Sequence, residues 1–189
     1  MRGLFILFLL ACALGVHPEP LRSIQDSPKN EFEAVHVSTS QETLLGKSVV
    51  KIVKDSAVKE VDELTFAKMK SSAFGNGSIE VTVLSKLLPN APAFSRGFIG
   101  IAFRINTSNS EFECIYIRPA NGRDSSQLRR NHTVQYFSFQ GYKFDKLRKN
   151  APGEYESYAD VGLNEWIKLK LVVKVGRQNF SSTAANSLH

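Results

Sequence analysis

The residue types best suited to binding chemistry gather in one segment, from Arg118 to Lys149. This segment holds eight Lys and Arg residues against two Asp residues, and its formal charge of +6 equals that of the whole chain. Amide and aromatic side chains lie between the charges. Guanidinium and amide groups form directed hydrogen bonds, and aromatic rings offer flat apolar faces. The sequence therefore places the candidate binding residues in this segment.

Three interpretations of the segment stay open. In the first, it is a solvated connection whose arginines pair with backbone carbonyls and with carboxylates such as Glu154 and Glu156. In the second, it binds a saccharide, because sugar hydroxyls suit bidentate polar groups and sugar C–H faces suit aromatic rings. In the third, it binds nucleic acid, whose sites also combine basic and aromatic residues. An export signal at the N-terminus argues against nucleic acid, so the first two interpretations are favoured.

The saccharide interpretation assigns two kinds of contact. An aromatic platform for a sugar ring is expected from Tyr136 or Trp166. The polar contacts are expected from Arg118, Asn121, Arg130, Asn131, His132 and Gln135.

An enzymatic alternative needs a pair of acid–base groups. Glycoside hydrolysis uses two carboxylates, about 5 Å apart for retention or about 6.5–9.5 Å apart for inversion. A strand motif E-x-D-x-E, which would place carboxylates on one face, does not occur, and the nearest pair, Glu154 and Glu156, is expected on the solvent side of a strand. Glu113 lies in an apolar run, where it either is buried enough for acid catalysis or pairs with an arginine. The alternative function is a glycoside-processing hydrolase or lyase that uses Glu113 and His132.

No cofactor and no metal is expected from the sequence. The four histidines are scattered and lack the spacing of metal ligands, and no loop rich in Asp and Asn suits calcium. The G-x-S-x-G elbow, the phosphate loop and the dinucleotide fingerprint are also absent from the sequence. For the whole protein, a third functional alternative, besides the carbohydrate-binding module and the hydrolase or lyase, is a non-catalytic surface or scaffold protein.

Alternating apolar residues predict the strands that must position these groups. In the clearest run, Ile167 and Leu169 begin an apolar face, while Lys168 and Lys170 begin a polar one. A period of two is what a half-buried antiparallel strand requires. Short strands at regular spacing, without a sustained helical stripe, predict an all-β protein built as a two-sheet antiparallel β-sandwich. The expected strands are 78–84, 98–105, 112–117, 133–139 and 166–175.

The order of segments predicts one exported domain between two irregular ends. Residues 1–15 form an apolar run that is too short to span a membrane and is interpreted as a signal peptide. Residues 16–45 are polar and contain prolines, so a flexible leader is expected. The sandwich is expected over 46–176, and an irregular tail over 177–189.

The two cysteines carry different expectations. Small residues around Cys12 suit signal peptidase, which would release a periplasmic or extracellular protein. The sequence LLAC, which ends at Cys12, also matches a lipobox, which would leave the protein anchored at the cell surface by a lipid on that cysteine. A membrane is expected as a partner only through this anchor, and the main partner expected is a carbohydrate. Cys114, inside an apolar strand, is expected to be a small core residue.

Five stretches of the sequence resemble one family: FIGIAFRI, FECIYIRPANGR, QLRRNHTVQYFSF, KFDKLRKNAPGEYESYAD and GLNEWIKLKLVV. They are similar to an exported bacterial family of the concanavalin A-like lectin/glucanase superfamily, whose members are laminin-G-like jelly rolls related to 3-keto-disaccharide hydrolase domains. The resemblance extends from Glu60 to Val175 and implies a jelly roll whose concave face commonly receives carbohydrate. The sequence after Val175 departs from the family, because it is polar and lacks the alternation of a further strand. The chain is therefore expected either to end one or two strands short, with an open sheet edge, or to carry an altered tail.

Overall fold

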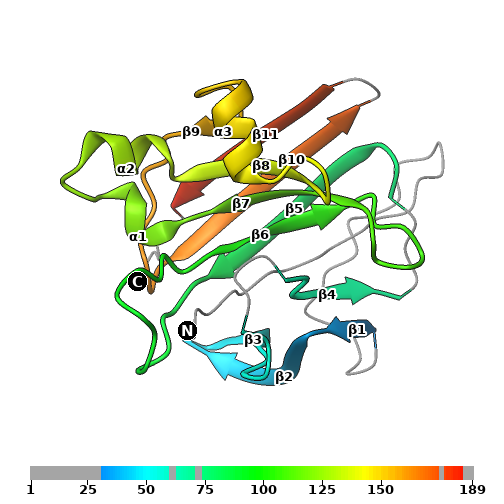
Figure 1. Ribbon diagram of the computed structural model, residues 1–189. Coiled ribbons are helices and arrows are strands. Elements are labelled where there is room, and N and C mark those ends of the chain that lie inside the picture. Colours follow the sequence, from blue (N-terminus) through cyan, green and yellow to red (C-terminus); the bar gives the residue numbers. More distant parts are fainter. Residues whose placement is uncertain (1–30, 60–62, 71–73, 175–176, 185–189) are drawn as a thin grey trace.

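The structure, a computed structural model, describes residues 31–59, 63–70, 74–174 and 177–184. Over these ranges the chain is mostly β, in antiparallel sheets (Figure 1). The elements in chain order are β1 (Phe32–Val35), β2 (Val37–Leu44), β3 (Lys47–Lys54), β4 (Phe66–Met69), β5 (Gly77–Leu84), β6 (Ile99–Phe103), β7 (Phe112–Ile117), α1 (Pro119–Gly122), α2 (Gln127–Asn131), β8 (Val134–Phe139), α3 (Phe144–Asn150), β9 (Glu156–Ser157), β10 (Trp166–Lys174) and β11 (Arg177–Ala184).

Two of the sheets share the main hydrophobic core. One has four strands in the order β6–β7–β8–β9, and the other has three in the order β11–β10–β5. The predicted period of two is confirmed in β10, where Leu169 and Leu171 are fully buried while Lys168 and Lys170 are exposed. The prediction of an all-β protein with sandwich-like packing is thus confirmed.

Strand β7 is buried on both of its faces. Ile115 and Ile117 point into the main core, whereas Cys114 and Tyr116 point to the opposite face. That opposite face carries a second cluster of buried side chains, which is rich in aromatic rings. Cys114 is a buried core residue, as predicted. Burial on both faces explains why the sequence FECIYI is almost continuously apolar.

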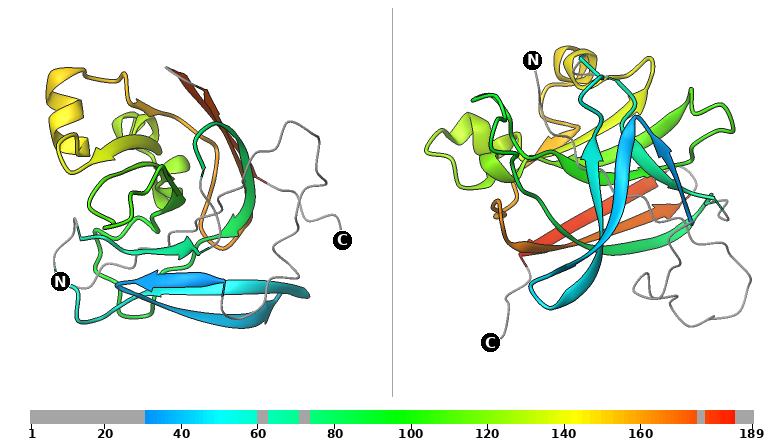
Figure 2. Two further views of the ribbon diagram at one scale, coloured as in Figure 1. Left: turned by 90° about the vertical axis from the view of Figure 1, so that its right-hand side faces the viewer. Right: turned by 90° about the horizontal axis from the view of Figure 1, so that it is seen from below.

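Two smaller sheets, β1–β4 and β2–β3, lie beside the sandwich (Figure 2). A third cluster of buried residues, Val50, Ile52 and Ala67, joins β3 to β4. The prediction of a flexible leader over 16–45 is wrong for residues 32–44, which form β1 and β2. Most side chains of β2 are exposed, so its sequence shows no alternation, and backbone pairing with β3 holds the strand. Residues 1–30, which include the predicted signal peptide and Cys12, lie outside the described residues.

The end of the chain also forms a strand. The prediction of an irregular tail over 177–189 is wrong for residues 177–184, which form β11 and pair with β10 along its length. Strand β11 is an edge strand, which needs a neighbour on one side and can pair through its backbone without apolar alternation. The open edge expected on β10 is therefore covered, and residues 185–189 lie outside the described residues.

Three short helices lie in the basic segment, where the sequence analysis expected none. They have four, five and seven residues, which is too short for a helical stripe to show in the sequence. Helix α1 carries Pro119 in its first turn, a position that suits proline. Helix α2 is capped by Ser126, whose hydroxyl accepts from the backbone N–H of Arg129 at 3.5 Å. In Figure 1, α1 and α2 lie together at one end of the four-stranded sheet.

Candidate functional site

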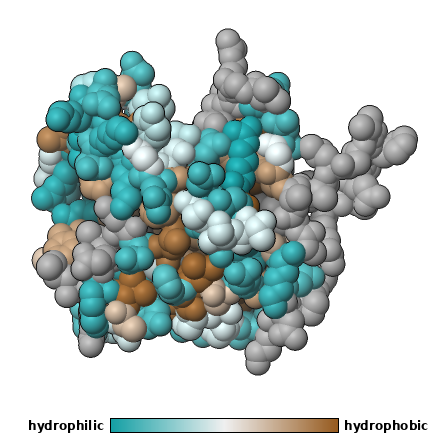
Figure 3. All heavy atoms as spheres, turned by 45° about the vertical axis from the view of Figure 1, so that its right-hand side comes forward, coloured by the Kyte–Doolittle hydropathy of each residue, from teal (hydrophilic) through white to brown (hydrophobic). Residues whose placement is uncertain are grey.

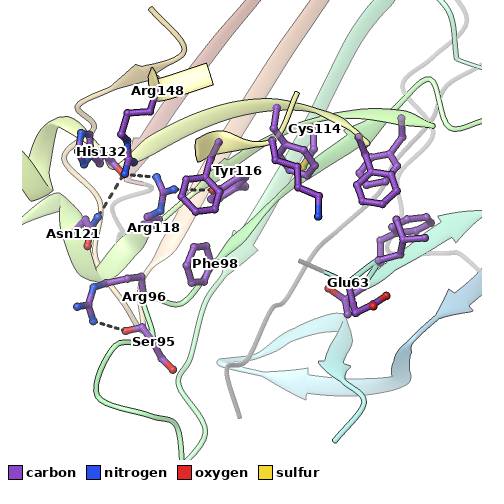
Figure 4. A pocket seen from close by; sticks show the side chains of 18 of the residues that line it. Glu63, Ser95, Arg96, Phe98, Cys114, Tyr116, Arg118, Asn121, His132 and Arg148 are labelled. Atoms are coloured by element: carbon purple, nitrogen blue, oxygen red, sulfur yellow. Dashed lines mark hydrogen bonds between the residues drawn. The ribbon is translucent and has the colours of Figure 1, made fainter. Parts of the chain in front are cut away.

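A pocket of about 440 Å³ lies on the face of the four-stranded sheet that points away from the main core. Hydrophobic side chains gather on one face of the molecule, bordered by hydrophilic ones (Figure 3). Polar residues gather at one end of the pocket, and Glu63 lies at the other (Figure 4). Eight of the 19 lining residues are Phe or Tyr: Phe66, Phe94, Phe98, Phe112, Tyr116, Phe137, Phe139 and Phe144. We call this site the aromatic pocket.

The rings of the aromatic pocket hold one another in place. Phe112 stacks on Phe139 with centroids 5.1 Å apart, and it meets Phe66 and Phe137 edge-on at 5.4 and 5.7 Å. Tyr116 meets Phe137 edge-on at 5.8 Å. The period of two along β7 and β8 puts Phe112, Tyr116, Phe137 and Phe139 on one face of the sheet, and Phe66 reaches them from β4. The result is a rigid apolar floor, already formed before a ligand binds.

Arg118 lies at the polar end of the pocket, where β7 ends and α1 begins. Its side chain is 8% exposed, and its guanidinium carbon lies over the rings of Tyr116, Phe98 and Phe144 at 4.9, 5.6 and 6.0 Å. Its Nη1 donates to the backbone oxygen of His132 at 2.8 Å, and its Nη2 donates to the hydroxyl of Tyr116 at 2.7 Å. Burial lowers the pKa of Arg118 and raises the pKa of Tyr116. The cation is thus held between aromatic rings and neutral oxygen atoms.

Glu156, on strand β9, is a buried carboxylate next to Arg118. Its side chain is 4% exposed, and it accepts hydrogen bonds from Nη2 and Nε of Arg148, the latter at 2.9 Å. Nη1 of Arg118 lies 3.8 Å from its Oε1, and Nε2 of His132 lies 3.5 Å from its Oε2. Two arginines therefore share one carboxylate. We call Arg118, His132, Arg148 and Glu156 the arginine cluster.

The contacts in the arginine cluster test two predictions, one on the exposure of Glu156 and one on the partners of the arginines. The expectation that Glu156 faces solvent is wrong, because Arg148 of α3 lies against the carboxylate and Arg118 lies beside it. The interpretation that arginines of the basic segment pair with backbone carbonyls and with Glu156 is confirmed for these two residues. Burial lowers the pKa of His132 below its usual 6.5, against the attraction of Glu156, so His132 is neutral at pH 7. The hydrogen bond from Arg148 to Glu156 raises the pKa of Arg148.

Two buried polar atoms of the pocket lining have no hydrogen-bond partner among the described residues: Asn121 Oδ1 and Ser95 Oγ. Asn121 is held by its other amide atom, Nδ2, which donates to the backbone oxygen of His132 at 3.4 Å. Asn121 and Ser95 are 5% and 4% exposed, so solvent has little access to either side chain. Buried polar atoms in native proteins are nearly always satisfied, so Asn121 Oδ1 and Ser95 Oγ each retain an unused capacity to accept a hydrogen bond.

The structure brings three of the six predicted polar contacts to the pocket: Arg118, Asn121 and His132. Gln135 is fully buried and lies outside the lining, and its amide donates to the backbone oxygens of Tyr136 and Tyr155 at 2.8 and 3.2 Å. The hydrogen bond to Tyr155 links β8 to the segment before β9. Gln135 therefore supports the sheet next to the pocket.

Arg130 and Asn131 lie in helix α2, outside the pocket lining. Nη1 of Arg130 donates to the backbone oxygens of Asp124 and Ser125 at 2.7 and 3.0 Å. Oδ1 of Asn131 accepts from the amide of Gln127 at 3.4 Å. Both side chains thus act within α2 and the turn before it.

The structure also places the two predicted aromatic platforms outside the pocket. Tyr136 lies on the other face of β8, where it packs against the main core and stacks on Tyr155 at 5.7 Å. Trp166 is 8% exposed, and Nζ of Lys47 lies 5.0 Å from its ring centroid. The rings that face the pocket are phenylalanines and Tyr116 instead.

Glu113 and His132, the predicted acid–base pair, do not meet. Glu113 accepts from Nη1 of Arg104 at 2.7 Å and from the hydroxyl of Tyr136 at 2.9 Å, on the face of β7 opposite the pocket. The expected arginine partner of Glu113 is thus confirmed. Burial and the hydrogen bond to Glu113 raise the pKa of Tyr136.

Sequence reasoning missed the phenylalanine floor, Ser95, and the role of Arg148. A signal for the floor exists, because Phe112 and residues 114 and 116 alternate with a second apolar set, which indicates two buried faces. That pattern shows that something covers the second face, but not that a pocket remains there.

The described ranges contain no group of three or more His, Cys, Asp or Glu side chains placed to hold a metal ion. Within the same ranges, no helix has the length and apolar character that crossing a membrane requires. Comparisons of the chain with protein-family models, with curated proteins and with solved structures found no match. The functional proposal is therefore drawn from the chemistry of the aromatic pocket.

Proposed function

We propose that the protein is an exported carbohydrate-binding module whose site is the aromatic pocket. The observation that carries this proposal is an aromatic floor that ends at the polar side chains of Arg118, Asn121 and His132. Asn121 Oδ1 needs a hydrogen-bond donor, whereas the guanidinium of Arg118 needs acceptors. A sugar hydroxyl both donates and accepts. A fatty acid would fill the apolar part of the pocket, but its carboxylate has no donor for Asn121.

The aromatic floor supports the same class of ligand. A sugar ring has an apolar C–H face that packs on aromatic rings, while its hydroxyls point outward to polar groups at the edge. The rings of Phe98 and Tyr116, 5.6 Å apart, lie next to the polar end, so one ring of a saccharide can meet both kinds of surface. The volume of about 440 Å³ is within the range of small-ligand sites, about 300–1,000 Å³.

The fold and the N-terminal sequence add support. The resemblance to the concanavalin A-like superfamily, together with sandwich-like packing, favours a jelly roll that binds sugar on one face of a sheet. The apolar run over 1–15 favours export, with release by signal peptidase or anchoring through Cys12.

Binding to a glycan array, followed by calorimetry with the full chain, tests this proposal. We expect Phe98→Ala to weaken saccharide binding by about tenfold, because it removes a ring at the junction of the floor and the polar end. Tyr158→Ala is the matched control, since Tyr158 is 53% exposed and lies outside the pocket lining. Absence of binding to every saccharide, or an equal loss in both variants, would contradict the proposal.

A further inference from the structure

The arginine cluster carries an excess of positive charge at the polar end of the pocket. Arg118 and Arg148 share Glu156, and no second carboxylate of the described residues lies within 4.0 Å of either guanidinium. His132 is neutral at pH 7, and the hydroxyl of Tyr116 is also neutral. Two arginines and one carboxylate, with the two neutral groups, therefore sum to one net positive charge. Arg118 and Glu156 are both buried, whereas the side chain of Arg148 is 39% exposed, so the excess charge lies at the polar end of the pocket and attracts an anion bound there.

The charged side chains differ between the two ends of the pocket. Arg96 also lines the polar end, where its Nη1 donates to the backbone oxygens of Ala93 and Ser95 at 2.9 and 3.0 Å. Glu63 lies at the opposite end in Figure 4. Lys143 also lines the pocket, with its Nζ 5.5 Å from the ring centroid of Phe139, but the three arginines Arg96, Arg118 and Arg148 lie together at the polar end, so a single anionic group is favoured there.

We propose that the saccharide bound in the aromatic pocket is acidic, and that the carboxylate of a uronic acid residue lies against Arg118 and Arg148. This inference rests on the proposed carbohydrate function. A carboxylate is planar and accepts paired hydrogen bonds, which matches guanidinium groups. The hydroxyls of the same ring supply hydrogen-bond donors for the polar end of the pocket, which an inorganic anion lacks.

Pairs of ligands that differ only in charge test the inference. Oligomers of galacturonate and glucuronate are compared by calorimetry with the same oligomers after reduction of the carboxylates to alcohols, using the full chain at pH 7. We expect the acidic member of at least one pair to bind tenfold or more tightly. Equal affinity within each pair would overturn the acidic ligand and leave the carbohydrate function standing. Absence of saccharide binding, or tighter binding of dodecanoate than of any saccharide, would overturn both.

Variants of the arginine cluster test which residues cause the preference for the acidic oligomer. We expect Arg118→Gln to reduce the preference for the acidic member to less than twofold, and Arg118→Lys, which keeps the charge, to retain part of it. Arg129→Gln is the matched control, because Arg129 is an exposed arginine paired with Asp124 outside the pocket lining. If the buried substitution prevents folding, Arg96→Gln, at a partly exposed position, is expected to weaken the preference. A full preference in every folded variant would overturn the inference.

Discussion

Arg118 belongs both to the packing of the fold and to the lining of the pocket. Three rings and two oxygen atoms surround its guanidinium, and it still reaches the pocket. A buried arginine is tolerated only when hydrogen bonds and nearby charges compensate for its lost hydration. The same contacts fix its orientation before a ligand arrives. Binding at Arg118 therefore costs little side-chain entropy.

His132 gives the folded state a pH dependence. Burial lowers its pKa in the native protein, and on unfolding the pKa returns to about 6.5. Below that pH the unfolded chain binds more protons than the native one, so this part of the free energy of unfolding is present above about pH 6.5 and is lost as the pH falls. We expect His132→Asn to reduce the fall in urea-unfolding free energy between about pH 6.5 and about pH 5.

A second histidine serves as the control for this experiment. His36 is exposed, and asparagine tolerates its positive φ of 51°. His36→Asn makes the same substitution away from the arginine cluster, and the two variants are compared. If the unfolding free energy of His132→Asn falls with pH as steeply as that of the unmodified chain, His132 does not cause the pH dependence.

At the residue scale, the sequence predicted the polar end of the site better than its floor. Arg118, Asn121 and His132 stand out because they lie in a locally basic segment next to strand ends. Their neighbour Arg130 has the same chemistry, but the turn of α2 directs its side chain to backbone carbonyls. Glu156 looked like a surface acid because burial by α3 depends on contacts that the sequence does not show.

At the scale of elements, strand β7 is the part of the fold on which the site depends. It contributes Ile115 to the main core and Tyr116 to the pocket, and Arg118 follows directly after its end. A shift of β7 toward or away from β6 would move both faces together. The distance between these two strands therefore sets the position of the site.

Gly100 on β6 controls that distance. It lies opposite Tyr116, and a Cβ at this position would be 2.3 Å from the backbone oxygen of Ile115 and 2.5 Å from Cα of Tyr116. We expect Gly100→Ala to lower the free energy of unfolding by about 1–3 kcal/mol or more, because the strands must separate to fit the methyl group. Saccharide binding should weaken as well, since Tyr116 positions Arg118.

Gly75→Ala is the control for Gly100→Ala, because a Cβ at Gly75 would meet no atom within 4 Å. Urea unfolding and calorimetry of the two variants are compared. Equal stability of the two variants would contradict the role assigned to Gly100.

The sequence predicted the strands whose side chains alternate and missed those held mainly by the backbone. β5, β7 and β10 were found because one or both faces are buried. β2 was missed because most of its side chains are exposed, and β11 because an edge strand of polar sequence pairs without an apolar pattern. Pairing between distant segments, such as β1 with β4, is a tertiary property that no local pattern reveals.

At the scale of the whole molecule, the charge distribution is the main feature. The formal charge of residues 118–149 is +6, and ion pairs of Arg123 with Asp160 and Glu165 and of Arg148 with Glu156 offset part of it. A concentrated charge attracts oppositely charged ligands over about 10 Å at 0.1 M salt. The positive charge that remains favours the approach of anions to this side of the molecule.

This distribution predicts a salt dependence of association. We expect the association rate constant of an acidic oligosaccharide to fall by about tenfold between about 0.05 and about 0.5 M NaCl, while its dissociation rate changes less. Stopped-flow fluorescence of Tyr and Trp measures both rates. The carboxyl-reduced oligosaccharide is the control and should show little salt dependence. Equal salt dependence of the two ligands would argue against electrostatic attraction.

The wall that Phe66 contributes to the pocket has a mechanical consequence. Phe66 belongs to β4, which pairs with β1 near the start of the described chain, and its ring meets Phe112 of β7 at 5.4 Å. Tension applied to the chain before residue 31 would load β1 first, then β4, and then this ring contact. A ligand in contact with both rings would stabilise this contact. Tension on the chain would then weaken ligand binding, and a bound ligand would raise the force needed to separate β4 from β7.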